Sequence, residues 1–178
     1  YPDSRDSPQY FGTIAEDSSV VSSNLPVLHW FTASPSGAER DSGSRGSIYY
    51  RGEFYDNIKA DKHGQSTGSF PKKSFDFDFN KGDRFLPYDG GKRAKDINLI
   101  TNWADKSKTR NTIGYEIMRM AGHPAHYSFA VRVQQNGQFF STADLVEDGD
   151  DRYLERVNLD GDGALYKMYN RLDSSNSG

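Results

Sequence analysis

The chain has 178 residues, the length of one ordinary domain with a hydrophobic core, and 11 Tyr and 11 Phe indicate that most of it folds. Its net charge is −3 with the two signs interspersed, so the basic stripe typical of nucleic-acid binding is missing and no nucleic-acid partner is expected. No apolar run approaches the roughly 20 residues that span a bilayer, and the absence of Cys excludes disulfides, Cys-based zinc sites and Cys nucleophiles.

Composition divides the chain into three parts. Residues 1–24 are rich in Ser, Asp and Pro and are predicted to form an extended or flexible arm. Residues 25–171 are predicted to hold the domain, and residues 172–178 a polar tail.

The first strand signals lie directly after the arm. Residues 26–31 are a short apolar run, followed by a Ser/Gly/Pro loop over 34–46. Residues 47–50 and 53–55 flank Arg51-Gly52, which predicts a hairpin, and residues 56–61 are expected to begin the next strand.

Alternation is strictest in residues 74–80. Phe75, Phe77 and Phe79 occupy one face and two Asp residues the other, the pattern of a strand with one buried face. Residues 127–133 repeat it, and Asn136-Gly137 then predicts a type I′ turn into a strand over 139–142.

One helix is predicted over 109–121, with Gly122 at the position after its C-terminus. Its apolar face consists of Ile113, Ile117, Met120 and Ala121. A shorter helix is expected near Asp150. The predicted class is α+β, a mostly antiparallel sheet with one main helix packed on it, which is the plan of a protein-kinase small lobe.

A loop of small residues precedes the strand at 74–80. Residues 63–70 could hold phosphate with main-chain N–H groups and hydroxyls, with Lys72 or Lys73 reaching the same phosphates. If the strand already runs at 73, Lys73 points inward beneath the Phe side chains and needs a partner, for which Glu116 is a candidate. The alternatives are a flexible loop with two solvated lysines and an exposed Glu116.

Other polar clusters carry weaker signals. Residues 143–154 hold five acidic groups that could bind a cation, or form a solvated turn and the first turn of a helix. Asp160 and Asp162 resemble the start of a calcium loop, but Tyr169 stands where the bidentate Glu is needed, which favours an Asp-Gly turn. His123 and His126 lack an evident third ligand and are not expected to bind metal.

Six pieces in order resemble the CotH family of spore-coat kinase-like proteins, from about Pro26 to Lys167, as far as the N-terminal half of the family's domain. They are the following: Gly64-Gln65-Ser66; Lys72-Lys73-Ser74-Phe75; the helix from Arg110-Asn111 to Gly122; the strand and hairpin at 131–137; Glu147, Asp150 and Tyr153-Leu154; and Leu165-Tyr166-Lys167.

The resemblance implies a secreted or cell-surface protein that binds ATP with Mg²⁺ and phosphorylates Ser or Thr of secreted or coat proteins. It places the phosphates under Gly64, Gln65, Ser66 and Thr67 and against Lys73, and the adenine beside Leu145–Glu147. Asp61 and His63 stand where the family often carries Arg. The family's catalytic and metal-binding acids follow the Leu-Tyr-Lys motif, so no catalytic residue is expected in this chain, and Lys167 has no assigned role.

Two functional classes therefore stay open. In the first, the chain is part of an active extracellular kinase with protein substrates. In the second, it is a catalytically inactive structural or interaction module of a surface assembly, with contacts through the arm or edge strands that could include a homo-oligomer.

Overall fold

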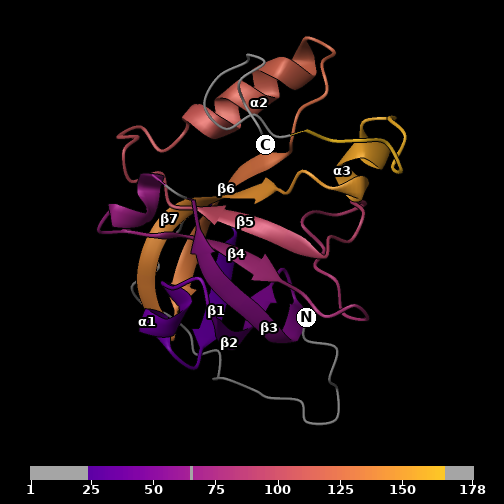
Figure 1. Cartoon of the computed structure of the whole chain (residues 1–178). Coiled ribbons are helices and arrows are strands. Elements are labelled where there is room, and N and C mark those ends of the chain that lie inside the picture. Colours follow the sequence, from indigo (N-terminus) through magenta and orange to yellow (C-terminus); the bar gives the residue numbers. More distant parts are fainter. Residues whose placement is uncertain (1–23, 65, 167–178) are drawn as a thin grey trace. The chain divides into compact units, whose positions relative to one another are not determined.

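The computed structural model describes residues 24–64 and 66–166, and the chain divides after Asp148 into two compact units. In the first unit, seven strands form a closed barrel in the order β1-β2-β3-β4-β5-β7-β6 (Figure 1). The strands are β1 (Val27–Thr32), β2 (Ser44–Tyr50), β3 (Glu53–His63), β4 (Ser74–Asp78), β5 (Asp96–Ile100), β6 (Ser128–Gln135) and β7 (Gln138–Glu147).

One parallel ladder closes the barrel. β1 pairs with β6 over only four positions, from Val27 opposite Arg132 to Trp30 opposite Gln135, while all other neighbours are antiparallel. Asn136 strengthens this seam, because its side chain accepts a hydrogen bond from the Thr32 N–H (2.9 Å) and donates one to the Thr32 carbonyl (3.2 Å). Its φ of 50° and that of Gly137 (80°) are those of the predicted type I′ turn, which is confirmed.

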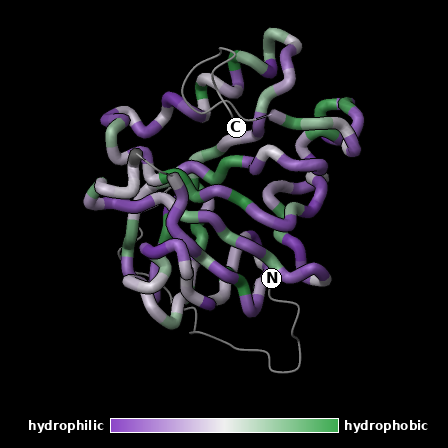
Figure 2. The backbone as a smooth tube through the Cα atoms, in the orientation of Figure 1, coloured by the Kyte–Doolittle hydropathy of each residue, from purple (hydrophilic) through white to green (hydrophobic). Residues whose placement is uncertain are grey.

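Aromatic side chains fill the barrel. Trp30 is fully buried, and its ring meets those of Phe75 and Phe77 edge-on at 4.8 and 5.1 Å between centroids. Phe79 stacks on Phe85 at 4.9 Å between centroids. The predicted alternation is confirmed, since Phe75 and Phe77 in β4 and Phe79 directly after it are all buried. Figure 2 shows the corresponding alternation of apolar and polar positions along the strands.

The predicted fold class is wrong: the structure is a mostly β closed barrel, not an α+β sheet covered by one main helix. Its helices are short: α1 (Pro35–Ala38), η1 (Ser66–Ser69), α2 (Arg110–Met120) and α3 (Asp151–Arg156). α2 lies near its predicted position but buries no residue, and Ile113, Ile117 and Met120 are 52, 59 and 79% exposed.

The sheet closes on itself because its strands bend. Register shifts lie between Gly46 and Ile48 in β2 and between Val133 and Gln134 in β6, and such irregularities increase local twist and curvature. A Cβ at Gly46 would overlap the carbonyl oxygen of Phe31, so the close approach of β1 and β2 requires glycine there. The core is then filled by side chains of the sheet itself, and it needs no covering helix.

Two strand predictions also change. Residues 56–61 do not begin a new strand but lie within β3, which contains one left-handed residue, Asn57 (φ 57°). β5 was not predicted, although Ile97 and Leu99 are buried in it.

The described part of the second unit contains α3. The Asp150 carboxylate caps this helix by accepting a hydrogen bond from the Tyr153 N–H at 3.0 Å, so a short helix near Asp150 is confirmed. Further along, Asp160 forms a turn in which its carboxylate accepts from the Asp162 N–H (3.0 Å) and its carbonyl from the Gly163 N–H (2.9 Å). Across the described residues of both units, no helix has the length and apolar character needed to cross a bilayer.

Candidate functional site

The candidate phosphate loop connects β3 to β4. β3 ends at His63, Gly64 turns the chain with a φ of 89°, η1 spans Ser66–Ser69, and β4 begins at Ser74. A Cβ at Gly64 would overlap the Thr67 hydroxyl, so glycine permits both the backbone conformation and this close approach. Gln65 lies outside the described residues.

Lys73 points back into this loop. Its ammonium group donates to the carbonyl oxygens of Gly68 and Phe70, both at 2.6 Å, and the residue is half-buried. It does not lie beneath the Phe side chains, because β4 begins one residue later and the strand alternation does not extend to position 73. Among the described residues Lys73 has no carboxylate partner, so two carbonyl dipoles fix the ammonium in place and leave its charge unneutralised.

Lys72 takes the opposite direction. Its ammonium group donates to the Phe140 carbonyl at 2.7 Å and lies 4.2 Å from the centroid of the Phe140 ring. The two adjacent lysines therefore contact different parts of the barrel: Lys73 contacts the loop, and Lys72 contacts Phe140 on β7.

A second lysine approaches the loop from β3. The methylene carbons and ammonium group of Lys62 lie 3.7–3.8 Å from the position that a Cβ on Gly68 would occupy, and its ammonium pairs with Asp41 at 3.0 Å. Asp41 is 87% exposed, so this pair is a weak surface interaction. Two ammonium groups thus lie close to Gly68.

The two predicted acidic residues lie away from this loop. Glu116 on α2 pairs with Arg119 on the same helix, and no hydrogen bond or ion pair joins it to Lys73. Glu147 is buried at the end of β7, where its carboxylate accepts from the Tyr127 N–H at 3.3 Å and lies 3.9 Å from Nδ1 of His126. The structure therefore brings Gly64, Thr67 and Lys73 to one loop, in which η1 begins at Ser66, but Glu116 and Glu147 lie elsewhere.

The acidic residues of 143–154 have different roles within the two units. Asp144 is buried and Asp150 caps α3. In the described ranges no group of three or more His, Asp or Glu side chains is placed to hold a metal ion.

A polar network that the sequence did not reveal anchors the start of α2. Asn111 donates to the side-chain oxygen of Asn102 (2.9 Å), and Asn102 donates to Asp144 (2.7 Å). Lys108 donates to the carbonyls of Thr101 (2.9 Å) and Asn102 (2.6 Å). Burial raises the pKa of Asp144, and the Asn102 hydrogen bond opposes that shift. The one sequence signal for this network is the Arg110-Asn111 motif at the start of the helix, because the Asn111 side chain takes part in the network.

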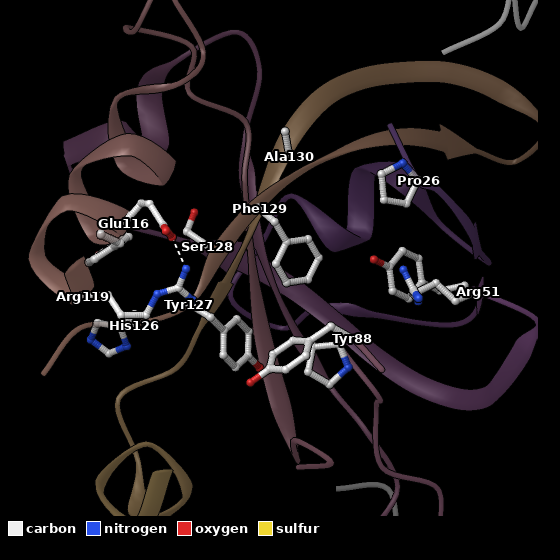
Figure 3. A pocket seen from close by; sticks show the side chains of 13 residues that line it. Pro26, Arg51, Tyr88, Glu116, Arg119, His126, Tyr127, Ser128, Phe129 and Ala130 are labelled. Carbon is white, nitrogen blue, oxygen red and sulfur yellow. Dashed lines mark hydrogen bonds and ion pairs between the residues drawn. The ribbon is translucent and has the colours of Figure 1, made fainter. Parts of the chain in front are cut away.

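A pocket of about 450 Å³ lies elsewhere in the first unit (Figure 3). None of its lining residues belongs to the 64–73 loop. Tyr88, Tyr127 and Phe129 occupy its centre, Arg51 lies at one end, and Glu116 with Arg119 at the other. Sequence reasoning missed it because its walls come from five separate segments of the chain.

The structure therefore defines a small closed β-barrel with a loop of small residues bounded by lysines. The family described as CotH kinase protein matches residues 60–178, which is more than half of the chain, so this chain belongs to the CotH family. The matched segment includes the loop, both lysines at its end, α2 and β6–β7. No curated protein matches the chain.

Proposed function

We propose that this chain is the nucleotide-binding part of a CotH-type kinase, holding the phosphates of ATP at the loop of residues 64–70. The observation that carries the proposal is the Lys73 ammonium group, which two carbonyl oxygens hold beside η1 and which no carboxylate of the described residues neutralises. A phosphate oxygen would exchange with one carbonyl and gain a charge-assisted hydrogen bond. Main-chain N–H groups of a turn of small residues supply further donors.

The donor set suits a triphosphate better than a metal ion alone. Lysine ammonium and main-chain N–H groups bind anions, whereas the described residues around the loop contain no set of acidic ligands for Mg²⁺. Magnesium would therefore arrive bound to the phosphates, where it supplies charge neutralisation for phosphoryl transfer. The protein's share at this loop is to orient the phosphates.

The substrates of the complete kinase are proposed from the family. CotH-type proteins are associated with spore coats and surfaces, so the phosphoacceptors are Ser or Thr of secreted or coat proteins, and the chain is placed outside the cytoplasm. The acidic residues that would act as base and metal ligands are not among those at the loop. Binding of nucleotide, and not turnover, is therefore the activity to measure on these 178 residues.

Neighbouring lysines provide a matched pair for the test. Isothermal titration with ATP and Mg²⁺ should show saturable binding to the wild-type chain, and Lys73→Met should abolish it. Lys72→Met, which removes the same charge one residue away, should leave it largely intact, because that ammonium faces Phe140. Equal losses in the two variants would show that general charge, and not the Lys73 geometry, attracts the nucleotide.

A second candidate function is a catalytically inactive interaction module of a surface assembly. It is supported by α2, whose apolar residues Ile113, Ile117, Met118 and Met120 are 47–79% exposed. A nucleotide at 100 times its Kd should stabilise the fold by about 2.7 kcal/mol. An unchanged melting temperature at millimolar ATP and Mg²⁺ would favour this module over the kinase.

A further inference from the structure

The pocket between α2 and the barrel contains a strand edge that no described strand pairs with. β1 pairs with β6 only from Arg132 onward, so the β1 ladder does not cover Ser128–Val131 of β6. Five consecutive residues, 126–130, line the pocket. Alternate side chains of a strand point to opposite faces, so a continuous run of lining residues means that the edge itself faces the pocket.

Hydrogen-bond parity identifies which main-chain groups face outward. The Tyr127 carbonyl accepts from the Glu147 N–H of β7 at 3.1 Å, while the Arg132 N–H donates to Pro26 on the opposite side at 2.9 Å. Odd positions of this stretch therefore direct their main-chain groups to β7, and even positions direct them away. Ser128 and Ala130 consequently present their N–H and C=O groups to the pocket.

α2 forms the opposite wall and is held there by polar and ring contacts. The hydroxyls of Thr112 and Ser128 lie 3.2 Å apart, and the Tyr115 ring meets the His126 ring at 5.5 Å. The opening is thus a groove bounded by a strand edge and a helix, as Figure 3 shows for the residues around Ser128 and Glu116.

The floor and rim define the chemistry of an occupant. The ring of Tyr88, which is 36% exposed, meets the Tyr127 ring edge-on at 5.4 Å between centroids, and Tyr127 stacks on Phe129 at 6.0 Å. Because three aromatic rings line the middle of the groove, this part accepts an apolar or aromatic side chain. The lining has two guanidinium groups, Arg51 and Arg119, against one carboxylate, although the whole chain is net negative. Arg51 also interacts with the Tyr50 side chain, and its ion pair with the 84% exposed Asp89 is a weak surface interaction that another acid can replace.

We infer that this groove binds an extended acidic peptide of another protein, which adds as a strand to β6 along Ser128–Val131. The open edge is about 13 Å long at roughly 3.3 Å per residue, which accommodates four or five peptide residues. Main-chain hydrogen bonds to Ser128 and Ala130 would give affinity, and an apolar side chain on the tyrosines with an acid at Arg51 would give selectivity. The inference goes beyond the proposed nucleotide site and does not depend on it.

The test uses fluorescein-labelled pentapeptides of the form Glu-Val-X-Val-Glu, with Tyr, Phe, Leu or Pro as X, and fluorescence anisotropy with the whole chain. At least one peptide should bind saturably, and Ala130→Pro should weaken it more than tenfold, because proline removes the outward N–H but not the bonds to β7. Tyr88→Ala, in a loop outside the sheet, should weaken it at least fivefold and provides a second test if the proline variant does not fold. Lysine in place of both glutamates should also weaken binding.

Three results would overturn the inference. The first is the absence of saturable binding for all four peptides, and the second is binding unchanged by Tyr88→Ala or by N-methylation of the peptide amides. The third is equal affinity for N-acetyl-tyrosine amide, which would make the groove a small-molecule pocket. Nucleotide titrations on the same variants separate the two sites, since Ala130→Pro and Tyr88→Ala should leave ATP binding unchanged.

Discussion

The most buried tryptophan offers a quantitative test of how the barrel core is built. Trp30 is fully enclosed, and its indole N–H finds no acceptor among the described residues. Trp30→Ala should destabilise the chain by about 3–5 kcal/mol through cavity formation. The substitution also removes the edge-on ring contacts to Phe75 and Phe77, so the destabilisation should lie at the upper end of this range.

Trp30→Phe separates the contribution of ring packing to stability from the cost of burying an indole N–H without an acceptor. Phenylalanine removes about two carbon atoms of buried surface, which costs about 1.5 kcal/mol at roughly 0.8 kcal/mol per CH₂. It also removes a buried N–H without an acceptor, which recovers about 1–3 kcal/mol. The two terms nearly cancel, so the free energy of unfolding should stay within about 1 kcal/mol of the wild-type value.

The assay is urea unfolding followed by far-UV circular dichroism, with the m-value compared between variants. Trp103→Phe is the control, because Trp103 is 48% exposed and its replacement should change stability by less than about 0.5 kcal/mol. If Trp30→Phe is as destabilising as Trp30→Ala, the assignment of an unsatisfied indole N–H in this core is refuted.

Three further predictions follow from the geometry. Gly46→Ala should destabilise the barrel by about 1–3 kcal/mol or more, because its Cβ would overlap the Phe31 carbonyl; an unchanged urea midpoint would contradict the close β1–β2 approach. Gly114→Ala should slow hydrogen exchange in α2, since its Cβ meets nothing within 4 Å and alanine favours helix by up to about 1 kcal/mol; faster exchange would contradict this. Burial raises the pKa of the Asp144 carboxyl above 3.8, so the folded chain keeps this carboxyl protonated to a higher pH than the unfolded chain does. The contribution of this proton to the free energy of unfolding is therefore present at low pH and is lost as the pH rises. Asp144→Asn should therefore reduce the loss of stability as the pH rises above about 4, and an identical pH profile in both proteins would refute it.

Local strand signals in this chain could be predicted because they depend on neighbouring residues alone. The alternating Phe side chains of β4 and the Asn136-Gly137 turn are determined by side-chain direction and by positive φ angles, and both are confirmed. Closure of the barrel could not be predicted in this way. It depends on contacts such as Thr32 with Asn136, which lie 104 residues apart, and on strand irregularities that leave no periodic signal.

The error in fold class came from α2. Periodicity showed that Ile113 and Ile117 share one face of a helix, but it could not show whether a sheet covers that face, and these residues are 52 and 59% exposed. In the candidate site too, the part formed by neighbouring residues could be predicted and the part that depended on the position of α2 could not. The loop and Lys73 are adjacent in sequence and meet in space, whereas a Lys73–Glu116 pair required the helix to lie over the β4 strand, and Glu116 pairs with Arg119.

The most direct measurement of the central claim is a crystal structure of the chain with a non-hydrolysable ATP analogue and Mg²⁺. Phosphate density is expected within about 3 Å of the Lys73 ammonium group and of main-chain N–H groups at residues 66–68. Phosphates bound only between α2 and β6, or Lys73 still bonded to both carbonyls with no density beside it at saturating nucleotide, would contradict a phosphate site at this loop.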